Sequence, residues 1–209
     1  DRRDLAPMSA ALPASDAAMV ALRAIALRRT TETCTGPAHD ASHVERVAAL
    51  ADAIARAEGA DREVVAAASL LHELFNHRKD HPDAARSGDL AAPLAADVLA
   101  EVGLDRISDA VVACIRDHAW SKGVVPSTLE GKVLQDADRL DAIGAVGIAR
   151  CFAVAGELRR GFYDTRDPLA ARRPLDDRTY TLDHFFVKLL RIPERLHTDT
   201  ARALAAPRI

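Results

Sequence analysis

The sequence has little of what marks several large classes of protein. Its three cysteines, Cys34, Cys114 and Cys151, show no CxxC spacing and are odd in number, which argues against a disulfide framework. Basic residues number 28 against 31 acidic ones, without the basic excess of a nucleic-acid binder. No apolar run reaches the ~18 residues of a membrane span, and the first ten residues lack a signal peptide's apolar core. We expect a cytoplasmic globular protein that binds neither a nucleic-acid polymer nor a membrane.

Signals for strands and for common nucleotide-binding loops are also missing. No alternation of apolar and polar residues lasts long enough to predict a sheet. Neither GxGxxG nor GxxxxGK[ST] occurs, so neither a dinucleotide fold nor a P-loop is indicated. The pattern instead predicts an all-α bundle of about eight or nine helices. Residues 1–36 are expected to form an N-terminal segment and a first helix that packs on the main domain, residues 37–209, in one globular unit.

Apolar residues recur at helical spacing along most of the chain. The expected helices are 16–33, 42–58, 61–75, 89–102, 105–118, 127–140, 141–160, 182–192 and 194–205. Polar loops are expected at 76–88, 119–126 and 161–180. Gly144 and Gly147, inside a predicted helix, are typical of a close approach to a neighbouring segment.

Four polar residues fall on or beside the apolar faces of three of these helices. His43 lies four residues before Val47, and His72 and Glu73 end the third helix. Asp136 shares a stripe with apolar side chains at positions 129, 133 and 140. Buried imidazoles and carboxylates are costly unless they are paired, so a shared divalent ion is one explanation. The alternatives are core histidines, a solvated Glu73 at a helix end, and a helical scaffold whose buried polar groups only form hydrogen bonds.

A mixed nitrogen and oxygen ligand set suits Mn, Fe, Zn, Co or Ni better than Ca. Such an ion can polarise a phosphoryl oxygen and generate hydroxide near neutral pH. His72 and Glu73 point about 100° apart on a helix, so both reach one ion only if it lies between helices near the end of the third.

Three motifs resemble the HD-domain metal-dependent phosphohydrolases, whose pattern is a histidine, a His-Asp doublet and a distant aspartate on an all-α scaffold. They are HDxxHxxRV at 39–47, the doublet at 72–73, and QDADRLDAIGAVGIAR at 135–150. An HSxS-like loop lies between the last two, at 118–121. The similarity covers about residues 37–200 and is greatest to bacterial HD proteins implicated in nucleotide pyrophosphohydrolysis. This chain departs from the pattern at Glu73, where the doublet has Asp, and at Ala119, which replaces a small hydroxyl residue.

The resemblance implies a role for each polar residue of these motifs. The implied metal ligands are His43, His72, Glu73 and Asp136, holding one divalent ion. Manganese is the first choice, and iron, cobalt, nickel, zinc and magnesium are the alternatives. The implied catalytic groups are His118, Asp138 and Asp40, and the implied substrate-binding groups are Lys79, Lys122, Arg139 and Asp141. Simpler alternatives stay open: a helix N-cap for Asp40, caps or arginine partners for Asp138 and Asp141, a helix C-terminal His118, and solvated lysines.

The expected reaction is hydrolysis of a small phosphorylated substrate, and the resemblance favours a nucleotide. Pyrophosphate release from (d)NTPs is the sharper hypothesis and rests on the resemblance alone. A 5′-nucleotidase activity and a nucleotide-sensing module without turnover are the alternatives. Cyclic-dinucleotide hydrolysis is disfavoured because no HHxxDGxGYP-like segment occurs. The protein is expected to act as a monomer or homodimer.

Overall fold

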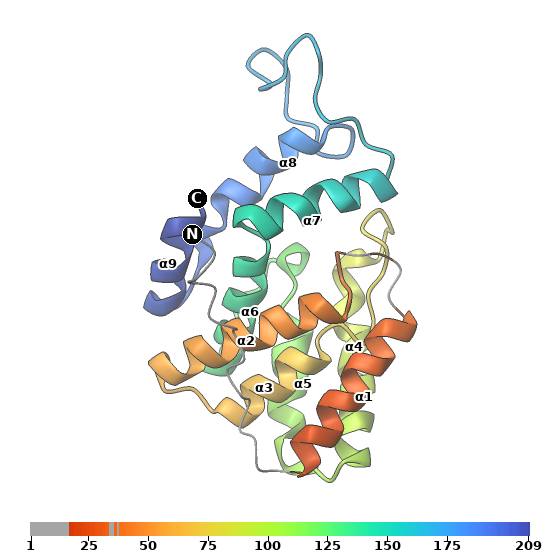
Figure 1. The fold of residues 1–209 in the computed structure, drawn as a ribbon, viewed down its shortest axis with the longest axis vertical. Helices are drawn as coiled ribbons and strands as arrows, with labels where there is room; N and C mark the ends of the chain where they lie inside the picture. Colours follow the sequence, from red (N-terminus) through yellow and green to blue (C-terminus); the bar gives the residue numbers. More distant parts are fainter. Residues whose placement is uncertain (1–16, 34–35, 37) are drawn as a thin grey trace, which may run out of the picture.

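The computed structural model describes residues 17–33, 36 and 38–209, and Figure 1 shows its ribbon. Within those residues the protein is all-α, as predicted, with nine α-helices, no strand and one isolated β-bridge between Gly161 and Tyr180. Cys34 and Pro37 lie outside the described residues. The division of the chain at residues 36 and 37 therefore stays a prediction.

The helices span Ala17–Thr33 (α1), Ala41–Glu58 (α2), Arg62–Leu71 (α3), Ser87–Glu101 (α4), Ser108–Asp117 (α5), Leu129–Asp141 (α6), Gly144–Glu157 (α7), Thr181–Val187 (α8) and Asp199–Ala205 (α9). The connections between helices range from two residues, between α6 and α7, to the long segment between α7 and α8. No helix in the described part of the chain is long and apolar enough to cross a bilayer.

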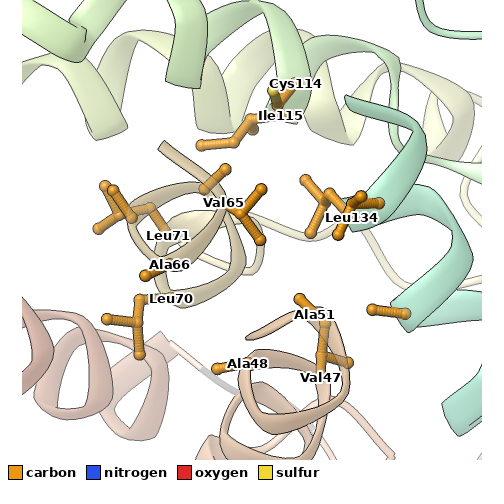
Figure 2. Packing of buried hydrophobic residues seen from close by; sticks show 14 of the residues in the cluster. Val47, Ala48, Ala51, Val65, Ala66, Leu70, Leu71, Cys114, Ile115 and Leu134 are labelled. Carbon is orange, nitrogen blue, oxygen red and sulfur yellow. The ribbon is translucent and has the colours of Figure 1, made fainter. Parts of the chain in front are cut away.

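The centre of the bundle is α3, which contacts α1, α2, α5 and α6. All its residues from Val64 to Leu71 are buried, and a helix that is apolar on every side belongs inside a core. Figure 2 shows Val65, Leu70 and Leu71 among side chains that include Val47 of α2 and Ile115 of α5. Because α3 runs through the middle of the bundle, its last residue brings the following segment into the protein interior.

The α3 helix ends at Leu71, four residues earlier than expected. Asp61 caps its start, accepting hydrogen bonds from the backbone N–H groups of Glu63 and Val64. At the other end the His72 side chain lies 2.7 Å from the Ser69 carbonyl oxygen, which a continuing helix would use. The chain turns there, so His72 and Glu73 lie just beyond the helix.

The C-terminal third also differs from the expected pair of long helices. α8 stops at Val187 because Lys188 has φ −131° and ψ −59°, outside helical geometry. Short 3-10 turns follow at Leu189–Arg191 and Pro193–Arg195. α9 begins only after Thr198, whose side chain accepts a hydrogen bond from the Ala201 N–H. In Figure 1, α7, α8 and the loop between them form one end of the molecule.

The turn from α6 into α7 depends on two glycines. Gly144 has φ +74°, a conformation that favours glycine. A Cβ at Gly147 would lie 2.2 Å from the Ala142 carbonyl carbon and oxygen, so no larger residue fits without a backbone shift. The close approach expected at Gly147 is therefore present, between the start of α7 and the end of α6.

Candidate metal centre

The His72–Glu73 doublet lies directly beyond α3, in the interior of the bundle. His72 is 1% exposed, and its Nδ1 faces the Ser69 carbonyl oxygen. A carbonyl oxygen only accepts hydrogen bonds, so Nδ1 carries the proton and Nε2 keeps its lone pair. Burial lowers the pKa of His72 to about 4, and the ring is neutral at neutral pH.

His43 projects from the first turn of α2, which Asp40 caps by accepting the His43 backbone N–H at 3.0 Å. Its Nδ1 lies 2.8 Å from an oxygen of Asp141, and Arg46 and Arg150 also donate to that carboxylate. These hydrogen bonds hold the pKa of Asp141 at about 2, although burial acts to raise it. Asp141 therefore fixes the His43 ring with Nδ1 protonated and Nε2 facing the doublet.

Two of the expected roles are corrected by these contacts. Asp40, expected to be catalytic, is instead the N-cap of α2, where its carboxylate bonds the first-turn backbone and the Ser42 hydroxyl. Asp141, expected to bind substrate, is instead buried behind His43 and engaged by two arginines. Neither residue lines the cavity described below.

The Nε2 atoms of His43 and His72 face each other at 3.4 Å. One Glu73 oxygen lies 3.5 Å from the first and 3.7 Å from the second, and Asp138 Oδ1 lies 3.5 Å from His43 Nε2. Burial lowers the pKa of His43, but hydrogen bonds to Asp141 and Glu73 raise it overall. Two ring nitrogens and two carboxylate oxygens therefore converge on one point, where a proton or a cation would stabilise them.

Glu73 is oriented from its outer side. His39 Nδ1 lies 3.0 Å from one carboxylate oxygen, and the Asn76 amide donates to the other at 2.7 Å. Burial acts to raise the pKa of Glu73, but the nearby His39, His43 and His72 hold it well below its usual range. The carboxylate is thus ionised, and the longer side chain of Glu brings it alongside both Nε2 atoms.

Asp138 lies at this cluster and Asp136 does not, which corrects the expected ligand set. Two residues apart on a helix are about 200° apart around its axis, so the two carboxylates leave α6 in opposite directions. Asp136 is fully buried and accepts hydrogen bonds from the backbone N–H groups of His197 and Thr198 and from the Thr198 hydroxyl. It anchors the start of α9, whereas Asp138 forms a group with His43 and His72 whose ligand atoms lie within 4.8 Å of one another.

The side chains present fit a divalent metal ion. The imidazoles of His43 and His72 can each offer an Nε2 lone pair to an ion. The carboxylates of Glu73 and Asp138 lie beside the same two atoms. Burial acts to raise the pKa of Asp138, but the nearby His43 and His72 lower it overall. A mixed set of this kind suits manganese, iron, cobalt, nickel or zinc.

A cavity of about 350 Å³ opens directly beside this cluster. Pockets that take small molecules and cofactors usually measure about 300–1,000 Å³. His72, Glu73 and Asp138 form part of its wall, and basic and aromatic side chains form much of the rest. Those side chains come from the loop after α3, from the 118–121 segment, and from α6, α7 and α8.

Besides Asp138, three of the expected substrate or catalytic residues line this cavity. His118 is 8% exposed, and its Nδ1 lies 2.6 Å from the Ile115 carbonyl oxygen. Lys79 extends from the polar loop after α3, and Arg139 lies on α6. The Arg139 guanidinium stands 5.3 Å from the centre of the Trp120 ring and donates to the Arg195 carbonyl.

Lys122, also expected to bind substrate, does not line the cavity. Its Nζ donates to Asp89 at 2.8 Å and to the Arg116 carbonyl oxygen at 2.7 Å, and it lies 3.4 Å from Asp117. It fastens the 118–123 turn to α4 and α5, which corrects the expectation that it binds substrate.

Sequence reasoning missed two basic residues of the cavity wall, Arg150 and Lys188. Arg150 is part of the QDADRLDAIGAVGIAR motif, but nothing in its spacing indicates that it bonds Asp141 and the Ala38 carbonyl oxygen. Lys188 lies inside a predicted continuous helix, and the break that directs it toward the cavity has no clear signal in the sequence.

Comparison with known proteins gives four consistent results. The family model described as "HD domain" matches residues 40–143. The uncharacterized protein YpgQ of Bacillus subtilis is 40% identical over 175 residues, covering 81% of this chain and 77% of that protein. A crystal structure of YpgQ in complex with ADP has a TM-score of 0.67 at 36% identity, covering 91% of this chain and 87% of that one. An HD-superfamily hydrolase from Bacillus thuringiensis has a TM-score of 0.67 at 28% identity, covering 91% and 88%.

Proposed function

This chain belongs to the HD-domain superfamily of metal-dependent phosphohydrolases, and we propose that it hydrolyses a nucleotide, with (d)NTP pyrophosphohydrolysis as the specific reaction. The observation that carries the proposal is the pair of Nε2 atoms 3.4 Å apart, flanked by two carboxylates at the wall of a basic cavity. That arrangement supports an ion at one end of a site for an anionic substrate.

His43, His72, Glu73 and Asp138 are the residues that would hold the ion. Manganese is our first choice, with iron, cobalt, nickel, zinc and magnesium as alternatives. A divalent ion bound there supplies Lewis acidity toward a phosphoryl oxygen and lowers the pKa of water. Asp141 keeps the His43 ring in the tautomer that presents Nε2, and a hydrogen-bonded carboxylate behind a ligating histidine strengthens binding.

Other residues of the cavity are suited to the substrate. Lys79 and Arg139 line the cavity and supply positive charge for phosphate oxygens. His118 Nδ1 faces a carbonyl oxygen, and among the described residues nothing hydrogen-bonds its Nε2. His118 is therefore free to exchange a proton with the substrate through Nε2.

A nucleotide is supported by the size of the cavity and by one relative. The volume of about 350 Å³ suits a ligand of that size, and YpgQ was crystallised in complex with ADP. Trp120 offers an aromatic ring in the same wall. The choice of pyrophosphate as product rests on the motif resemblance. A 5′-nucleotidase activity or a nucleotide-sensing role without turnover uses the same cavity.

A screen of (d)NTPs, nucleoside diphosphates and monophosphates with Mn²⁺, Co²⁺ and Mg²⁺ tests the proposal, with ³¹P NMR to identify products. Pyrophosphate and a nucleoside monophosphate are expected from triphosphates, and Asp138→Ala should abolish their formation. Orthophosphate from monophosphates alone would identify a 5′-nucleotidase. Binding without any product, with all three ions, would replace catalysis by sensing.

A further inference from the structure

Lys188 is a basic residue in the same cavity as the metal centre. It follows the last residue of α8, where the helix breaks, and it lines the cavity together with His72, Glu73 and Asp138. Its Nζ lies 5.6 Å from the centre of the Trp120 ring. Arg139 approaches the same ring at 5.3 Å, so two cavity-lining cations stand around one indole.

Lys188 has no anionic partner among the residues that the structure describes: none places a carboxylate within 4.0 Å of its Nζ. Lys122, by contrast, pairs with Asp89. Lys188 is partly buried, and an ammonium group partly withdrawn from water without a counter-ion costs free energy, which an incoming anion can offset. The cation–π contact with Trp120 offsets only part of that cost.

The charges around Lys188 are mostly positive. Burial, together with the nearby Lys79, Arg150 and Arg139, lowers the pKa of Lys188 to about 8 against the opposing effect of Asp138. This part of the cavity is therefore rich in positive charge, and Asp138 is a nearby negative charge that raises the pKa of Lys188. Asp138 lies outside ion-pair distance of Lys188, so its carboxylate does not pair with the ammonium group.

We propose that Lys188 binds the phosphate next to the one held at the metal centre, and so makes the site select phosphoanhydrides over monophosphates. The inference rests on the proposed function and identifies the residue that binds the second phosphate. An ion neutralises much of the charge of one phosphate, but each further phosphate brings new charge that needs its own cation. Lys188 supplies that cation, with Lys79 as its neighbour.

The test is a binding measurement, because Trp120 is the single tryptophan of the chain and stands beside Lys188. Its fluorescence is followed while full-length protein in excess Mg²⁺ is titrated with inorganic pyrophosphate or orthophosphate, and calorimetry supplies the same dissociation constants independently. Lys188→Met is compared with Lys188→Arg and with Lys132→Met, a lysine of α6 outside the cavity wall. Thermal unfolding checks that each variant folds.

Lys188→Met should weaken pyrophosphate binding about 10- to 100-fold, the usual value of a charge-assisted hydrogen bond, and orthophosphate binding less than about threefold. Lys188→Arg and Lys132→Met should stay near wild type. Equal losses for both anions, or no loss for pyrophosphate, would overturn the inference. Turnover of nucleotides by the wild-type protein is measured separately. If the wild type hydrolyses none of them but still binds pyrophosphate through Lys188, the proposed function is wrong and the assignment of Lys188 to the second phosphate stands.

Discussion

Asp136 and Asp138 are two residues apart on α6, and the structure predicts opposite consequences when each is changed to Asn. Asp136 accepts hydrogen bonds from His197 and Thr198, so Asp136→Asn should destabilise the fold and leave metal binding in place. Asp138 faces the two imidazoles and has a side chain 26% exposed, so Asp138→Asn should weaken metal binding at little cost in stability.

The size of the Asp136 effect follows from its contacts. Oδ2 accepts three hydrogen bonds, at 3.1, 2.9 and 2.8 Å, and Oδ1 accepts one at 2.9 Å. An Asn can keep its carbonyl oxygen at the Oδ2 position, but its NH₂ then faces the His197 N–H. Loss of the charge and of one acceptor should cost about 2–4 kcal/mol of unfolding free energy. For a chain of this size that lowers Tm by about 4–16 °C.

The assay combines thermal or urea unfolding of metal-free protein with calorimetric titration of Mn²⁺. Asp138→Asn should unfold within about 1 kcal/mol of wild type and bind Mn²⁺ at least about tenfold more weakly. A stable Asp136→Asn that has lost its metal, beside an Asp138→Asn that retains it, would refute the assignment of the two carboxylates.

Three further outcomes are expected. Asp141→Asn should weaken Mn²⁺ binding about 10- to 100-fold, because the carboxylate that orients His43 is lost, and calorimetry would show this. For a nucleoside triphosphate, kcat/KM should fall above about pH 8 as Lys188 loses its proton, since its pKa is about 8; a Lys188→Arg profile that keeps the same decline would exclude this cause. Gly147→Ala should lower Tm, because its Cβ would meet the Ala142 carbonyl; an unchanged Tm in a melting experiment would show that the α6–α7 turn can shift.

Helical periodicity predicted most of the fold because the signal is local. The apolar stripe that contains Asp136 correctly indicates a buried carboxylate. It cannot say what pairs with that carboxylate, because the donors lie about sixty residues away at the start of α9. A buried Asp that binds a metal ion and a buried Asp that caps a helix have the same sequence pattern. The pattern therefore assigns Asp136 to a metal ion, although its partners are backbone N–H groups, and it leaves Asp138 as a catalytic candidate.

The other differences arise where a helix ends earlier than its sequence pattern predicts. α3 stops at Leu71 because the His72 side chain reaches a carbonyl of the preceding turn. α8 stops before Lys188, although the residues around it have ordinary helix propensity. These two breaks bring the doublet and Lys188 to the cavity, and neither is marked by Gly or Pro. The N-cap of α2 at Asp40, in contrast, is one of two alternatives visible in the sequence.

In the proposed metal centre one divalent ion is held by His43, His72, Glu73 and Asp138. The most direct measurement is an anomalous difference map from crystals grown with Mn²⁺, collected at the manganese absorption edge. We expect one strong peak per chain, within bonding distance of His43 Nε2, His72 Nε2 and oxygens of Glu73 and Asp138. No peak in the bundle, or a peak bonded to His39 and Glu73 without His72 and Asp138, would contradict this assignment.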